Sequence, residues 1–164
     1  MKYFTEDWHT GKLTDSQTNK SLKEYSQHLD TIYNDLPFVL KALSRNLPLH
    51  DGRILSVCYH SSNRKLVLNG IFGDLEIGYF SLRISYLELF SFESNYLEAI
   101  KEKPFLEILS DEIDITVDSQ YLHRILFSSY DEIEIQFSSL SIELSEADSK
   151  DYKKQKPKID IIRT

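Results

Sequence analysis

The clearest chemical pattern in the chain is a set of carboxylates that alternate with aliphatic side chains. Glu112 and Asp114 are separated by one isoleucine, as are Glu132 and Glu134, and Glu143 lies between an isoleucine and a leucine. Successive side chains of a strand point to opposite faces of a sheet. We therefore predict neighbouring strands with an apolar core face and a carboxylate-rich outer face.

Three kinds of chemistry suit such a face. Solvated acids maintain solubility, and paired carboxylates serve glycoside hydrolysis or Ca²⁺ binding, although the sequence has no D-x-D-x-D-G loop. An acidic docking surface would attract a basic protein, whose binding relieves repulsion between like charges on adjacent strands. Nearby tyrosines offer rigid contact area, while strand propensity explains the same residues. The candidate partner-binding residues are Glu112, Asp114, Glu132, Glu134, Glu143, Tyr121 and Tyr130.

Cys58 and His60 are the one pair with the spacing of a nucleophile and its base. On a strand both would leave the same face, but no third orienting group and no helix N-terminus adjoins them. The histidines show no H-x-x-x-H or H-E-x-x-H spacing, and the glycines form no phosphate-binding loop. We therefore predict no catalytic residue, no metal site and no cofactor.

Charge is distributed unevenly along the chain. The net charge is −7, and residues 88–149 hold fifteen Asp or Glu against three Lys or Arg. Such a surface repels phosphates, so we expect no nucleic-acid partner. A single cysteine, an acidic N-terminus without the pattern of a secretory signal, and no apolar run of roughly 20 residues favour a cytoplasmic protein that does not cross a membrane.

The spacing of apolar residues predicts the helices and strands that must position these side chains. Ser21 has N-cap spacing ahead of a helical stripe over residues 22–36, and a second helix ends at Pro48. Period-two patterns then predict strands, interrupted by a short helix over residues 94–103. The predicted strands include 54–60, 65–72, 80–86, 106–117, 121–127, 132–137 and 140–144.

This order predicts an α+β fold: two N-terminal helices packed on a bent, mainly antiparallel meander, with one additional short helix. Residues 1–149 would form a single domain, and residues 150–164 a lysine-rich tail that could end in an edge strand. The apolar phase of each element predicts the core residues, which are Leu22, Leu29, Ile32, Leu36, Leu40, Leu82, Ile84, Ile113, Ile115, Ile133, Ile135 and Ile142.

Three local patterns resemble a group of uncharacterised bacterial proteins common in Bacilli. They are the opening Met1 to Thr5 with Trp8, the stretch from Gly73 to Tyr86, and His123 to Phe127 followed by Tyr130 to Ile135. The resemblance rests on strand residues and implies no catalytic motif. As a small acidic α+β protein, the chain is also similar to immunity proteins, which bind and neutralise a toxin.

From these observations we expect a non-enzymatic protein-binding module, with toxin neutralisation as one form of that role. The acidic face would steer a basic partner and tyrosines would anchor it. The alternative is a small enzyme or ligand-binding domain with a site assembled from sequence-distant residues. Monomer and homodimer are both compatible with the sequence.

Overall fold

The computed structural model describes residues 1–93, 95–152 and 155–163, and these form an α+β fold with a seven-stranded, mainly antiparallel sheet. The predicted fold class and sheet type are confirmed. Three α-helices and a 3-10 turn, rather than two helices, precede the sheet. The helical elements are α1 (Glu6–His9), α2 (Asp15–Ile32), η1 (Tyr33–Asp35), α3 (Phe38–Arg45) and α4 (Asn95–Lys101).

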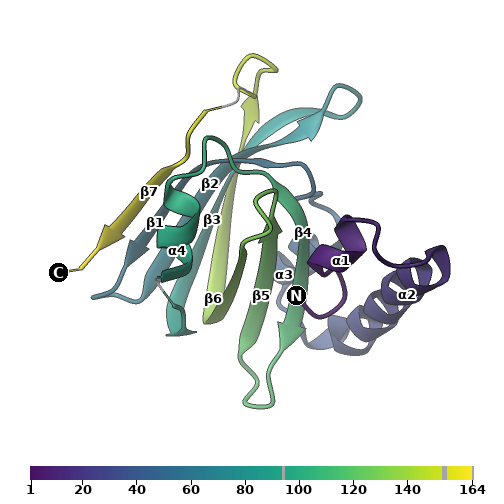
Figure 1. Cartoon of the computed structure of the whole chain (residues 1–164). Helices are drawn as coiled ribbons and strands as arrows, with labels where there is room; N and C mark the ends of the chain where they lie inside the picture. The colour runs from purple at the N-terminus through teal and green to yellow at the C-terminus, as the bar shows by residue number, and fades with distance from the viewer. Residues whose placement is uncertain (94, 153–154, 164) are drawn as a thin grey trace.

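The N-cap of helix α2 lies seven residues before the predicted N-cap, Ser21, so that prediction is wrong. Thr14 is the N-cap, because its hydroxyl accepts the backbone N–H of Gln17 while the Gln17 side chain accepts the backbone N–H of Thr14. The first turns of α2 extend beyond the sheet (Figure 1). Leu22, predicted in the core, is consequently 45% exposed, whereas Leu29 is buried.

The strand order is β4-β5-β6-β3-β2-β1-β7, which corrects the predicted simple meander. Two three-stranded meanders are joined through β3 and β6, and β7 adds in parallel to β1. Figure 1 shows α1 and α2 beside β4, with β7 at the other edge of the sheet. The strands are β1 (Arg53–His60), β2 (Lys65–Asp74), β3 (Gly78–Ser91), β4 (Ile108–Ile115), β5 (Tyr121–Phe127), β6 (Glu132–Ala147) and β7 (Lys158–Ile162).

Strand β6 is a single long strand where the sequence predicted two. Residues 132–137 pair with β5, and residues 136–147 pair with β3. The polar residues Ser138 and Ser139, which suggested a turn, continue the strand instead. One long strand can thus belong to both halves of the sheet.

The sheet curls until the start of β1 meets the start of β4. The N–H of Ile54 donates to the carbonyl of Leu106, and the N–H of Ile108 donates to that of Gly52, each at 2.9 Å. Side chains from both meanders and from α2, α3 and α4 fill the enclosed core. Of the predicted core residues, Ile32, Ile115 and Ile142 are half-buried, and the fully buried ones are Leu29, Leu36, Leu40, Leu82, Ile84, Ile113, Ile133 and Ile135.

Helix α4 buries Leu97 and Ile100 as its spacing predicts, while its predicted N-cap, residue 94, lies outside the described residues. Among the residues that the structure describes, no helix has both the length and the hydropathy needed to cross a bilayer.

Candidate functional site

The acidic strands lie side by side, and a single arginine stands between them. Arg124 on β5 is opposite Glu112 on β4 and Glu134 on β6. Its Nε lies 2.8 Å from a Glu134 oxygen, and its Nη1 lies 3.4 Å from Asp114 and 3.7 Å from Glu112. A guanidinium offers five donors in one plane, so one arginine can serve several carboxylates. These carboxylates therefore form a mixed cluster centred on Arg124.

Glu112 is the buried member of this cluster. Its side chain is 1% exposed, whereas the alternation of the sequence predicts an outward, solvated position. Its oxygens accept the backbone N–H groups of Lys2 at 2.9 Å, Tyr3 at 2.7 Å and Phe4 at 2.8 Å. These donors replace the water that a carboxylate loses on burial. Glu112 therefore anchors residues 1–4 across the sheet.

Asp114 connects the cluster to helix α2. His28 Nε2 lies 2.8 Å from one Asp114 oxygen, which also accepts the N–H of Ile115 at 2.9 Å. Partial burial by itself would raise the pKa of Asp114. The contacts with His28 and Ile115 and the charge of Arg124 outweigh burial, so the pKa lies below its ordinary value of 3.8.

This shift predicts an acid-dependent contribution to stability. The depressed pKa of Asp114 means that its contribution is present above pH 3.8 and is lost as pH falls through the lower folded-state pKa. Asp114→Asn should lower the free energy of unfolding by about 1 to 2 kcal/mol at pH 7. The difference from wild type should shrink below pH 4 in urea unfolding at a series of pH values. A constant difference down to pH 2 would contradict the assignment.

Three members of the predicted site remain accessible where β5 turns into β6. Tyr130 is 45% exposed, and the Glu132 and Glu134 side chains are 38% and 51% exposed. The Met1 amino group pairs with Glu132. Tyr130 has a φ of 61°, in the left-handed region that favours glycine. We call Tyr130, Glu132 and Glu134 the Tyr130 surface.

Tyr121 and Glu143 lie away from the Tyr130 surface. The Tyr121 ring is half-buried, with its centroid 6.0 Å from that of Phe137. Glu143 lies on the part of β6 that pairs with β3, 3.8 Å from Arg83 Nε. Of the predicted set, the structure thus brings together Glu112, Asp114, Glu132 and Glu134. Tyr130 lies in the turn before β6, and Tyr121 and Glu143 lie elsewhere on the sheet.

A buried polar chain that the sequence did not reveal crosses the core face. His123 and Tyr86 are both inaccessible to solvent; Tyr86 Oη lies 2.7 Å from His123 Nδ1, and His123 Nε2 lies 3.0 Å from Asp111 Oδ2. Burial, and secondly the charge of Asp111, raise the pKa of Tyr86 well above 10, so its hydroxyl stays protonated. With neutral histidine, Tyr86 donates to Nδ1 and Nε2 donates to Asp111. These contacts satisfy buried polar groups.

Cys58 and His60 share a face as predicted, with Sγ and Nε2 separated by 3.3 Å. Asp160 on β7 is opposite Cys58. Partial burial and then the charge of Asp160 raise the pKa of the Cys58 thiol. A nucleophilic cysteine requires the opposite shift. The pair therefore does not form an activated thiolate.

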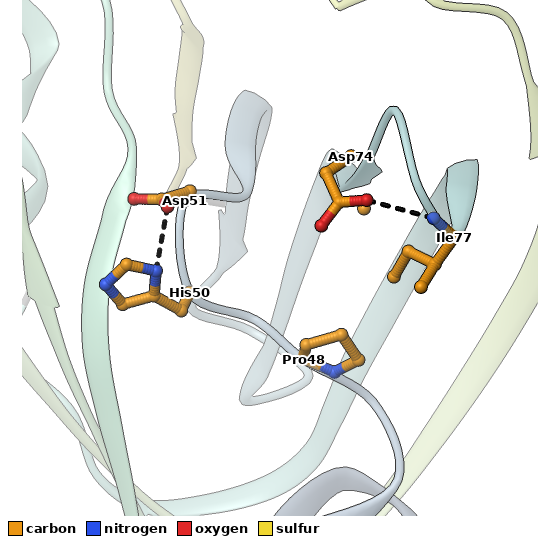
Figure 2. Close-up of a pocket in the computed structure, with 6 residues that line it drawn as sticks. Pro48, His50, Asp51, Asp74 and Ile77 are labelled. Carbon is orange, nitrogen blue, oxygen red and sulfur yellow. Dashed lines mark hydrogen bonds and ion pairs between the residues drawn. The ribbon is translucent and has the colours of Figure 1, made fainter.

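A small hollow lies between the segment before β1 and the β2–β3 hairpin (Figure 2). Pro48, His50 and Asp51 form one side, and Asp74 and Ile77 the other. The N–H groups of Ile77 and Glu76 donate to Asp74 and lower its pKa. The volume of about 180 Å³ is below the roughly 300 Å³ at which small-molecule sites begin.

Within the described ranges, no three His, Cys, Asp or Glu side chains are grouped so that they could hold a metal ion. Comparison of the chain with known proteins finds no matching family model, no matching curated protein and no matching solved structure.

Proposed function

We propose that this chain is a non-enzymatic protein-binding module whose partner carries a basic surface, and that the Tyr130 surface contacts that partner. A toxin neutralised by an immunity protein is a partner of this kind. The observation that carries the proposal is an exposed tyrosine held in a left-handed backbone conformation in the turn that leads into β6, where two exposed carboxylates follow.

The backbone conformation of Tyr130 indicates that a tyrosine at this position does not serve the stability of the fold. A left-handed conformation costs a residue with a Cβ atom roughly 1 to 2 kcal/mol, and glycine is the default residue there. The turn itself is well formed, because the N–H of Tyr130 donates to the carbonyl of Phe127 at 2.8 Å. An exposed aromatic ring at such a position points to a role in contact with another molecule.

The charges of the cluster centred on Arg124, which includes Glu134 of the Tyr130 surface, favour a cationic partner. Four carboxylates, Glu112, Asp114, Glu132 and Glu134, face one guanidinium and the Met1 amine. The residual negative charge would speed encounter with a basic surface. Tyrosine adds large contact area at low entropy cost, which is why it is frequent among binding hot spots.

The alternative, an enzyme or small-ligand domain, would need a hollow that suits a ligand. A hollow of about 460 Å³ over residues 146–151 is open to solvent and lined mainly by charged side chains. The hollow beside His50 is small, and neither His123 nor Cys58 lines it. His123 and Tyr86 are also fully buried, so a substrate could not reach them without local opening.

Tyr130→Gly separates binding from stability. We expect stability to be unchanged or to rise by up to about 1 kcal/mol, because glycine relieves the left-handed strain. Affinity for the partner recovered from the native host should fall at least tenfold, as expected for a lost aromatic anchor. Ser119→Gly is the matched control, since Ser119 has a φ of 60° in the β4–β5 turn. Unchanged affinity in Tyr130→Gly would contradict the role of the ring.

The double variant Glu132→Gln and Glu134→Gln tests whether the negative charge of the Tyr130 surface attracts the partner. The double variant should associate more slowly than wild type at low salt, and the difference should shrink at high salt, because exposed charges are screened over roughly 10 Å at 0.1 M. Association rates measured at both salt concentrations provide the test. Equal rates for the two proteins at low salt would rule out electrostatic steering by this surface.

A further inference from the structure

Strand β6 leaves part of its length without a second neighbour. Residues 138–147 pair with β3 on one side, while β5 ends its pairing at Phe137. Within the described residues, no other backbone hydrogen bond reaches residues 138–147 from the chain outside β3. Half of the main-chain groups along this stretch therefore face outward, as at any sheet edge.

The other two edges of the sheet are protected. On β4, the Tyr25 hydroxyl accepts the N–H of Ile113 at 2.9 Å, and α2 packs alongside. Strand β7 is short and carries Lys158 and Asp160, charges of the kind that discourage edge pairing. Residues 138–147 contain no proline, lysine or glycine. This stretch carries two charges, Glu143 and Glu146, but an edge without proline, lysine or glycine can still pair with another strand.

We propose that this open edge of β6 pairs with the same edge of a second copy of this chain, in antiparallel orientation about a two-fold axis. The proposal does not depend on the proposed function, because the Tyr130 surface lies at the other end of β6. A second copy is the occupant that this edge favours, because the edge has a self-complementary pattern of side chains.

That pattern selects one register. When Ile142 faces its own counterpart, Leu140 of each copy is opposite Leu144 of the other, and Glu143 is opposite Ser141. Leu140, Ile142 and Leu144 then each meet an aliphatic partner, and no like charges are opposed. A two-residue shift to a centre at Glu143 would oppose the two glutamates, and a shift to Ser141 would place Leu144 opposite Ser138.

The burial of these side chains fits such a contact. Leu140 and Ile142 pack against the core but are only half-buried, and Leu144 is 53% exposed. A second copy would extend the apolar face of the sheet over all three. A single strand pair is smaller than the standard interface of roughly 800 Å² per partner, so we expect a concentration-dependent dimer.

Sedimentation velocity over a range of concentrations tests the association. Wild type should shift toward twice its 19.2 kDa mass as concentration rises. Leu144→Lys should raise the dissociation constant at least tenfold, because the lysine would face Leu140 at two symmetric places. Leu75→Lys is the matched control, since Leu75 is 86% exposed on the β2–β3 hairpin. A monomer at all concentrations, or equal effects of the two variants, would overturn the proposal.

Disulfide trapping tests the register. In a Cys58→Ser background, Ile142→Cys would face its own counterpart and should cross-link on mild oxidation, whereas Leu144→Cys would face Leu140 and should not. Non-reducing electrophoresis detects the cross-linked dimer, and thermal unfolding confirms that both variants are folded. Equal or stronger cross-linking through residue 144 would overturn the Ile142-centred register. Association with a different protein while wild type stays monomeric would overturn the choice of a second copy.

Discussion

Replacing Glu112 with alanine is expected to lower the free energy of unfolding by about 3 to 5 kcal/mol, the range for removing one partner of a buried charged contact. The side chain is 1% exposed and accepts the N–H groups of Lys2, Tyr3 and Phe4. Without it, three buried or partly buried donors lose their acceptor. Urea unfolding at pH 7 measures the change.

Glu112→Gln is the matched control for this prediction. Glutamine has the same shape and keeps one acceptor oxygen, but its NH₂ group would face main-chain donors. We expect an intermediate loss. Limited proteolysis should also cleave within residues 1–12 faster in Glu112→Ala, because the segment loses its anchor. Stability within 0.5 kcal/mol of wild type, with unchanged cleavage, would contradict the anchoring role.

Replacing Ile133 with alanine is expected to cost about 2 to 5 kcal/mol, because truncation of a large aliphatic core residue removes contacts and leaves a cavity. Ile133 is inaccessible to solvent and belongs to the main core cluster. Thermal and urea unfolding measure the loss. A change within experimental error would mean that this face of β6 is not packed as the structure has it.

Leu22→Ala supplies the control for Ile133→Ala. Both residues are predicted core positions of the sequence pattern, but Leu22 is 45% exposed on α2. Its truncation should therefore change stability by no more than about 0.5 kcal/mol. A large loss for Leu22→Ala would place the first half of α2 against the sheet.

Local periodicity was sufficient to predict the α+β class, most strands and most core positions. Alternation identified Ile113, Ile133 and Ile135 as inward residues, since a strand has only two faces. The helical pattern was less decisive: Leu22 and Leu29 share an apolar stripe, but only Leu29 is buried. How far a helix extends past the sheet depends on how it packs against the rest of the molecule. The spacing of its apolar residues does not reveal this.

The candidate site depended more strongly on tertiary structure. The sequence determined that Glu112, Asp114, Glu132 and Glu134 share the polar phase of their strands, because side-chain direction follows from strand geometry alone. Which of these carboxylates are exposed to solvent depends on the tertiary structure alone. The register that places Arg124 between the strands comes from its hairpin pairings with Glu112 and Glu134. The path of residues 1–4 over Glu112 comes from contacts across more than one hundred positions of the sequence. These pairings create the buried carboxylate and the half-neutralised cluster, and the pairing of β6 with β3 leaves the open edge of β6. The alternation within a single strand does not encode them.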